Sequence, residues 1–213
     1  RLHWLPNAVD VRHFRRRPDE VRRVDPHGRQ TLLFVGRLEP DKALDLLLEA
    51  WRRSLGRPGS GWRLRLIGEG SQEQHLRRLA DSLGIASSVE FVGEIPLVEE
   101  ELWGADACVL PSLREGLSNA LLEAMAAGLP VIATRVSGSE DFIRTGETGW
   151  LCEPGDVEAL AQALTELGAA PRHELERLGE CGRQLVEQRA SLPVVTRRLL
   201  ALYRGNTRAG GAR

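Results

Sequence analysis

Short apolar runs alternate with stretches of helical periodicity along most of this 213-residue chain. In the intervening stretches apolar residues recur every three or four positions, as in Leu44, Leu47, Leu48 and Trp51, which is typical of amphipathic helices. Strands that alternate with helices favour an α/β fold with a parallel sheet covered on both faces, and near-continuous apolar runs fit such buried strands. Five runs bounded by Gly, Pro or Asp are predicted to be the strands: Leu32–Val35, Leu64–Ile67, Val89–Val92, Ala107–Leu110 and Val131–Ala133.

The same pattern divides the chain into four parts. Residues 1–27 are rich in Arg and Pro without sustained periodicity and are expected to be a linker that leads into the domain. Residues 28–170 contain all five runs and are expected to form one compact α/β/α domain. Residues 171–204 are predicted to form C-terminal helices packed outside that domain, and the Gly- and Arg-rich residues 205–213 are expected to be a disordered tail.

Composition narrows the class of protein. Apolar residues make up 42% of the chain and charged residues 28%, which is typical of a folded globular protein. The formal net charge of -1 argues against a nucleic-acid-binding protein. The three cysteines lie far apart without metal-ligand spacing, so reduced thiols in the cytoplasm are expected. No apolar run reaches the roughly 18 residues of a membrane span.

The ends and the charge runs add two expectations. The chain begins with Arg1 rather than Met, so it is expected to be a fragment of a longer protein. Arginines at 15–17 and 22–23 leave open a peripheral contact with acidic lipid at the inner face of the membrane, although solvated surface charge is the simpler interpretation.

The loop after the first strand, residues 36–42, holds two cations. Lys42 is the only lysine among 29 lysines and arginines, and a lysine retained in such a chain suggests a role for a compact point charge, such as a phosphate contact. Lys42 is predicted to open the next helix, and a loop that presents Arg37 and Lys42 beside a helix N-terminus suits a diphosphate. Surface salt bridges with Glu39 or Asp41 are the alternative.

The loop after the fourth strand leads into another predicted helix, residues 120–127. Ser118 and Asn119 are favourable N-cap residues, and the N–H groups that follow them could receive a phosphate. Glu115 and Glu123 flank this helix start, and because carboxylates repel phosphate they are expected to accept hydrogen bonds from sugar hydroxyls. The alternative for Glu123 is a glutamate at the rim of the core.

Two more loops rich in small residues follow strands. Residues 68–70, Gly-Glu-Gly, come after the second strand, and glycines there would let the chain approach a ligand closely. Residues 137–141 come after the fifth strand and are predicted to start a helix. The carboxyl ends of parallel strands meet at one edge of a sheet, so all these loops are expected to face the same side.

Five stretches together form a recognisable pattern in a fixed order: Pro6-Asn7-Ala8-Val9-Asp10; Gly36-Arg37 with Lys42; Val92-Gly93; Glu115-Gly116 with Glu123-Ala124-Met125-Ala126, Gly128 and Pro130; and Thr148-Gly149 with Glu153-Pro154-Gly155-Asp156 and Ala159-Leu160. They resemble, in turn, the P-N-G-V-D that leads into the second domain, the phosphate-binding G-R-x4-K, the nucleobase loop, the E-x7-E signature and the T-G-x-L-x-x-P-G-D-x-x-A-L stretch of retaining glycosyltransferases of the two-Rossmann-domain (GT-B) type. The family that they resemble is glycosyltransferase family 4 (glycosyl transferases group 1).

The resemblance implies a fold and an activity. The chain would be the C-terminal, Rossmann-like, doubly wound half of a GT-B enzyme, which binds a UDP-, GDP- or ADP-sugar, while an N-terminal domain holds the acceptor. Arg37 and Lys42 would hold the diphosphate, and Glu115 would bind a hydroxyl of the transferred sugar. No D-x-D motif is present, and the family resemblance implies transfer without a metal or other cofactor.

The rest of the implied site binds the nucleotide. Backbone amides at Ser118 and Asn119 would bind the distal phosphate, Glu123 the ribose, and the backbone near Ile95 the base. The full set of implied nucleotide-sugar ligands is Gly36, Ile95, Gly116, Leu117, Ser118, Asn119 and Glu123. Ala43 departs from the family pattern, which has Gly after the lysine, and Ala8 departs from it in the leading motif.

Two alternatives stay open at this point. A module that binds a nucleotide sugar without transferring it would show the same residues, and so in part would a sugar-nucleotide epimerase of related architecture. The base, the sugar and the acceptor do not follow from the sequence.

Overall fold

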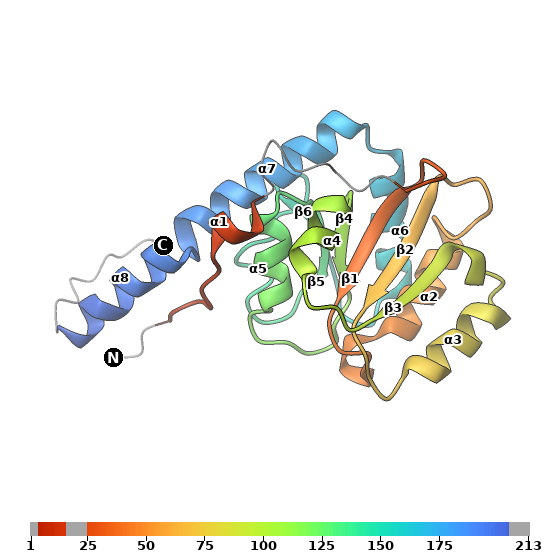
Figure 1. The fold of residues 1–213 in the computed structure, drawn as a ribbon, viewed down its shortest axis with the longest axis horizontal. Helices are drawn as coiled ribbons and strands as arrows, with labels where there is room; N and C mark the ends of the chain where they lie inside the picture. The colour runs from red at the N-terminus through yellow and green to blue at the C-terminus, as the bar shows by residue number, and fades with distance from the viewer. Residues whose placement is uncertain (1–3, 16–24, 205–213) are drawn as a thin grey trace.

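Six parallel strands form one sheet at the centre of the molecule (Figure 1). The computed structural model describes residues 4–15 and 25–204. The strand order is β3-β2-β1-β4-β5-β6, and every neighbouring pair is parallel, as in a Rossmann-like doubly wound sheet. The predicted fold class is confirmed. The strands are β1 Gln30–Val35, β2 Trp62–Ile67, β3 Val89–Gly93, β4 Ala107–Leu110, β5 Val131–Thr134 and β6 Gly149–Cys152.

The five strands predicted from apolar runs are all present, and β6 is an additional one. Strand β6 opens with Gly149, a residue type that is depleted in strands, and was not predicted. The helix predicted to start at residues 137–141 is wrong, because this stretch is a turn. The buried Ser139 hydroxyl donates to the carbonyl of Val136 and so closes the turn with a local side-chain bond that competes with helix formation.

Helices cover both faces of the sheet (Figure 1). One group, in which α2 contacts α3 and α6, lies on one face; the other, in which α5 contacts α1 and α7, lies on the opposite face together with α4. The helices are α1 Val11–Phe14, α2 Leu44–Arg53, α3 Glu73–Ser82, α4 Val98–Gly104, α5 Asn119–Ala126, α6 Val157–Ala169, α7 Arg172–Arg189 and α8 Leu192–Tyr203, with short 3-10 turns η1 Pro40–Lys42 and η2 Ala86–Ser88.

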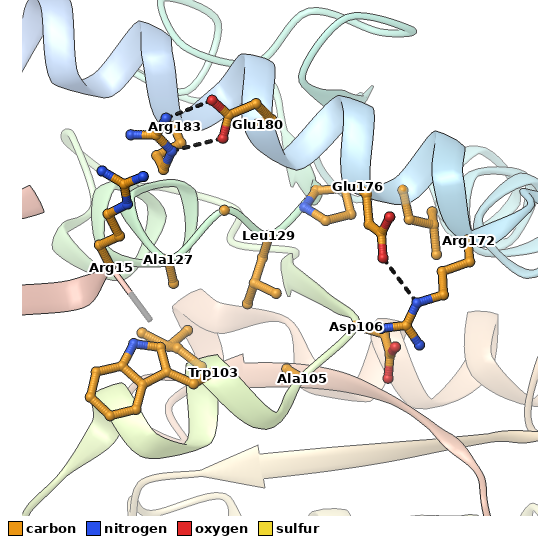
Figure 2. Close-up of a pocket in the computed structure, with 14 residues that line it drawn as sticks. Arg15, Trp103, Ala105, Asp106, Ala127, Leu129, Arg172, Glu176, Glu180 and Arg183 are labelled. Atoms are coloured by element: carbon orange, nitrogen blue, oxygen red, sulfur yellow. Dashed lines mark hydrogen bonds and ion pairs between the residues drawn. The ribbon is translucent and has the colours of Figure 1, made fainter. Parts of the chain in front are cut away.

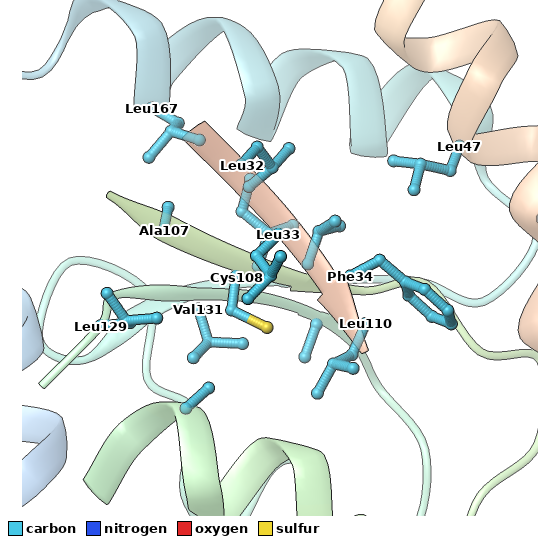
Figure 3. Packing of buried hydrophobic residues seen from close by; sticks show 14 of the residues in the cluster. Leu32, Leu33, Phe34, Leu47, Ala107, Cys108, Leu110, Leu129, Val131 and Leu167 are labelled. Carbon is cyan, nitrogen blue, oxygen red and sulfur yellow. The ribbon is translucent and has the colours of Figure 1, made fainter. Parts of the chain in front are cut away.

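The core is continuous from one layer to the next. Leu32, Leu33 and Phe34 of the central strand β1 are at most 1% exposed. Figure 3 shows side chains of β1, β4 and β5 packing with Leu47 of α2 and Leu167 of α6. Burial on both faces explains why these strands are continuous apolar runs in the sequence.

The segment before the domain, predicted to be a linker, contains a short helix. Within the predicted linker, a short helix α1 forms after Asp10, whose side chain accepts hydrogen bonds from the N–H groups of Arg12 and His13. Residues 1–3 and 16–24 of that linker, and the predicted disordered tail 205–213, lie outside the described residues.

The two C-terminal helices pack differently. Helix α6, which precedes them, is capped by Asp156, whose side chain accepts a hydrogen bond from the N–H of Ala159. Helix α7 packs mainly on α5 and buries apolar positions such as Leu178 and Val186. Helix α8 has no buried residue and projects from the body of the molecule (Figure 1). The prediction that both C-terminal helices pack against the domain therefore does not describe α8. Over the described residues, no helix is both long and apolar enough to cross a membrane.

Candidate functional site

The loops singled out in the sequence gather at the carboxyl edge of the sheet. All six strands are parallel, so the loops after β1, β2, β3, β4 and β5 leave from the same edge. Strands β2 and β3 lie on one side of β1. After β3 the chain crosses to the other side of β1 and forms β4, so the position between β1 and β4 is a topological switch point. Ligands of open α/β sheets bind at such a point, and the candidate cations follow β1 while Glu115 follows β4.

Lys42 and Glu115 form the central contact of this edge. The Nζ of Lys42 lies 2.6 Å from Oε2 of Glu115, although the two residues are 73 positions apart. The Lys42 side chain is only 13% exposed and that of Glu115 21%. Ser112 Oγ donates to the same carboxylate oxygen at 2.9 Å. The loops after β1 and β4 are therefore joined by a partly buried, charge-assisted hydrogen bond.

Lys42 does not open a helix, which corrects the sequence-based prediction. It ends the 3-10 turn η1, and α2 begins at Leu44, after Ala43. Ala43 adopts the left-handed conformation (φ 49°, ψ 42°), and its side chain is buried. This kink separates the turn from the helix and directs Lys42 toward the loop after β4, whose Leu113 N–H donates to the carbonyl of Asp41 at 2.8 Å.

Arg37 stands apart from this pair. Its side chain is 74% exposed, and its nearest described charge partner is Asp41, with 4.0 Å between Nη2 and Oδ2. The structure therefore leaves the guanidinium at the rim of the site. Glu39 is no salt-bridge partner of either cation; its carboxylate accepts from the N–H and the hydroxyl of Ser71, and these bonds lower its pKa.

Gly36, Arg37 and Ile95 line one hollow of about 330 Å³ between the loops after β1, β2 and β3. The loops touch one another, because a Cβ on Gly68 would lie 2.0 Å from the carbonyl oxygen of Gly36. This close approach is the physical reason for the Gly-Glu-Gly stretch. Glu69 of that stretch also lines the hollow, and the sequence analysis did not single out the remaining lining residues Val35, Ile67, Glu94 and Val98 as site residues.

Gly116, Leu117, Ser118 and Asn119 form the turn into α5. Ser118 is the N-cap residue as predicted, but its side chain makes no capping hydrogen bond, and the helix starts at Asn119 rather than Ala120. Within the described part of the chain, the N–H groups of Ser118 and Asn119 have no acceptor. The turn is packed tightly, since a Cβ on Gly138, whose φ is +83°, would lie 2.9 Å from the Cβ of Leu117.

Glu123 lies in surroundings different from those of Glu115. It is half-buried on α5, where burial and the negative charge of Glu99 raise its pKa, opposed by His13. His13 of α1 and Glu99 of α4 form a contact of 3.4 Å between Nε2 and Oε1. A half-buried carboxyl close to a like charge is costly, and such groups concentrate at functional sites.

A second hollow lies at the opposite, amino-terminal edge of the strands (Figure 2). It has a volume of about 280 Å³ between α7 and the residues that precede β4 and β5. Figure 2 shows Arg172 paired with Glu176 and Arg183 paired with Glu180, at 2.9 and 2.5 Å. Ligands of open α/β sheets bind beyond the carboxyl ends of the strands, so the carboxyl edge is the better candidate site.

Comparisons with known proteins identify the family of the chain and its fold. The family model described as glycosyl transferases group 1 matches residues 29–169. An exopolysaccharide phosphotransferase of Streptomyces coelicolor is 38% identical over 169 residues, which are 78% of this chain and 17% of that protein. The putative colanic acid biosynthesis glycosyltransferase WcaL of Escherichia coli is 33% identical over 203 residues, 92% of this chain and 49% of that protein. The chain thus spans at most about half the length of these two relatives.

A solved structure shows the same fold. The crystal structure of HepE from Anabaena in complex with UDP and glucose superposes with a TM-score of 0.84 over 94% of this chain and 56% of that one, at 18% identity. At that identity the likeness shows the fold, which is the one described above.

Proposed function

This chain belongs to the glycosyl transferases group 1 family, and we propose that it is the donor-binding half of a retaining glycosyltransferase of family 4. It binds a nucleoside-diphosphate sugar, and a further part of the protein holds the acceptor. The single observation that carries the proposal is the convergence of Lys42, Glu115 and the free amides of α5 at the switch point of the sheet. Binding of UDP and glucose by a protein of the same fold supports a nucleotide-sugar ligand.

In the proposed reaction, the bond between the anomeric carbon and the distal phosphate oxygen breaks, and the acceptor oxygen forms a new bond to that carbon on the same face. The proton of the acceptor hydroxyl passes to the departing phosphate oxygen. Negative charge grows on the departing nucleoside diphosphate. Lys42, Arg37 and the N–H groups of Ser118 and Asn119 stabilise that charge, and pre-positioned cations and dipoles lower such a barrier. Because these groups supply the positive charge, we expect transfer to need no metal.

The donor has to break the contact between Lys42 and Glu115. A diphosphate beside Lys42 replaces the carboxylate as the partner of the ammonium, and Glu115 becomes free to accept a hydrogen bond from a sugar hydroxyl. The pair thus keeps both groups in place and avoids an unpaired, partly buried charge before the donor binds.

The nucleoside occupies the hollow between the loops after β1, β2 and β3. Ile95 and the backbone around it contact the base, and Glu123 accepts hydrogen bonds from the ribose hydroxyls. The cost of keeping Glu123 half-buried beside Glu99 is understandable if the ribose is its partner in the complex. We place the protein in the cytoplasm, where nucleotide sugars are made.

Two measurements test the proposal. A thermal-shift series with UDP-, GDP- and ADP-sugars on this chain is expected to show stabilisation by one nucleotide class, since a ligand that binds only the folded state raises the melting temperature. Nuclear magnetic resonance of the product made by the full-length protein is expected to show the anomeric configuration of the donor. An inverted product would reject the retaining mechanism, and binding without turnover of any acceptor would favour a binding module.

A further inference from the structure

Asn7 connects the leading segment, residues 4–15, to the turn that opens α5. Its side-chain Nδ2 donates one hydrogen bond to the carbonyl oxygen of Leu117 at 2.7 Å and another to Oδ1 of Asn119 at 3.0 Å. The first of these bonds spans 110 positions of the chain. Leu117 and Asn119 flank Ser118, whose amide is one of the two groups that the proposed function assigns to the distal phosphate.

The bond to Leu117 fixes the direction of the Ser118 amide. The C=O of Leu117 and the N–H of Ser118 belong to one peptide unit, which is planar and trans, so the two groups point in opposite directions. A carbonyl directed at Asn7 leaves the Ser118 N–H directed to the other side of the turn. A hydrogen bond accepted by the carbonyl also polarises the peptide and strengthens its N–H as a donor.

The second bond occupies the side-chain oxygen of Asn119. A free carboxamide oxygen at the first helical position would compete for the unpaired N–H groups of the helix start, as side chains of this type commonly do. With Asn7 as its partner, Asn119 Oδ1 is held by the leading segment, and the backbone amides stay available.

Contacts of neighbouring residues hold the segment that carries Asn7 in place. Val9 is buried, its N–H donates to the carbonyl of Ala190 at 2.9 Å, and its carbonyl accepts from the N–H of Leu192 at 3.0 Å. Further on, Trp103 Nε1 of α4 donates to the carbonyl of Phe14 at 2.7 Å. The segment that carries Asn7 is therefore fastened to the body of the domain before α1 and at the last residue of α1.

We propose that Asn7 is a positioning residue for the donor diphosphate, which acts by aiming the Ser118 amide at the distal phosphate. This inference rests on the proposed function. A purely structural Asn7 would only fasten the leading segment, and its loss would then weaken the fold and every ligand alike.

The experiment compares Asn7→Ala with Asp10→Ala. Asp10 lies in the same segment and caps α1 but makes no described contact with the α5 turn, so Asp10→Ala loosens the segment without touching the turn. Binding of UDP, GDP and the corresponding nucleosides is measured by calorimetry, together with the melting temperature. Because neutral hydrogen bonds contribute modestly, Asn7→Ala is expected to weaken the favoured nucleoside diphosphate about three- to tenfold. Its nucleoside affinity is expected to stay unchanged.

The control and a second variant keep the outcomes distinct. Asp10→Ala should lower the melting temperature and leave both affinities unchanged. Asn7→Asp keeps the shape but turns a carboxylate toward the Leu117 carbonyl, and it should weaken the diphosphate at least as much as Asn7→Ala. Equal losses for nucleoside and diphosphate, or none, with a wild-type protein that binds normally, would overturn the role of Asn7. A wild-type protein that binds no nucleoside diphosphate would overturn the proposed function itself, and with it this inference.

Discussion

The ammonium of Lys42 lies 2.6 Å from a carboxylate oxygen of Glu115, so that the two groups proposed to bind different parts of the donor are each other's partners before the donor arrives. Both side chains are mostly shielded from water, which makes the contact stronger than an exposed salt bridge. Removing one side chain therefore leaves the other without its charge partner. Substitutions at the two positions are expected to change the affinities for nucleotide and sugar nucleotide differently.

Glu115→Ala is expected to separate nucleotide binding from sugar binding. The free nucleotide should bind as well as before, or slightly more tightly, because Lys42 no longer has a competing partner. The sugar nucleotide should lose about tenfold, the value of a hydrogen bond to a charged group. Calorimetric titration with both ligands measures this difference, with Asp41→Asn, which removes a more exposed carboxylate 3.9 Å from Lys42, as the control. Equal losses for both ligands would mean that Glu115 only braces the loop.

Glu123→Gln is expected to stabilise the protein at neutral pH. Burial and Glu99 raise the pKa of Glu123 in the folded state, so this group favours folding below its unfolded pKa and loses that contribution as pH rises through the folded pKa. The gain in melting temperature over wild type should therefore shrink as pH falls below about 4, near the usual glutamate pKa.

Glu147→Gln serves as the control for that series, because Glu147 is 64% exposed and lies beside Arg144. It should give no gain at neutral pH. A Glu123→Gln protein that melts lower than wild type at pH 7 would contradict the prediction and indicate a stabilising partner for the carboxylate.

Ala43→Gly and Ala50→Gly are expected to change the free energy of unfolding differently, although the chemical change is the same. Ala43 is left-handed, a conformation that costs an alanine about 1 kcal/mol, so glycine there should leave stability unchanged or slightly higher despite the lost methyl group. Ala50 is a buried interior residue of α2, where glycine should cost about 1 kcal/mol or more. Urea unfolding midpoints decide the matter; equal losses would show that the left-handed kink carries no strain.

We expect this chain by itself to bind the donor but to transfer no sugar. Transfer requires an acceptor held in line with the donor, and positioning supplies several kcal/mol of a typical barrier. The chain spans about half of WcaL, and the proposed function places the acceptor site outside residues 1–213. Product analysis with residues 1–213 and a panel of acceptors tests this; formation of any glycosylated product would contradict it.

The fold was largely predictable because the central strands are buried on both faces. Burial selects unbroken apolar runs in β1, β4 and β5, whereas in β2 and in the edge strand β3 charged residues interrupt the apolar positions. Strand β6 was missed because it opens with Gly149, a residue type that is depleted in strands, and α4 was missed because its seven residues carry too little periodicity.

The site was predictable only as a set of loops on one edge. The partners within it depend on contacts across long separations, such as Lys42 with Glu115 over 73 positions and Asn7 with Leu117 over 110. No local spacing encodes such pairs. The left-handed conformation of Ala43 does not follow from the residue itself, because alanine is normally a strong helix former; its only sign is the glycine that the family pattern has at this position.

The most direct test of the account is calorimetry of wild type, Lys42→Ala, Arg37→Ala and Arg53→Ala with nucleoside diphosphates and the matching nucleosides. Arg53 ends α2 and pairs with Glu158, so its variant controls for a general loss of positive charge. Charge-assisted contacts contribute about 1.5–3 kcal/mol, so Lys42→Ala and Arg37→Ala should each weaken the diphosphate roughly ten- to hundredfold and leave the nucleoside unchanged. Equal losses for nucleoside and diphosphate, or no loss, would contradict a diphosphate site at the carboxyl edge of the sheet.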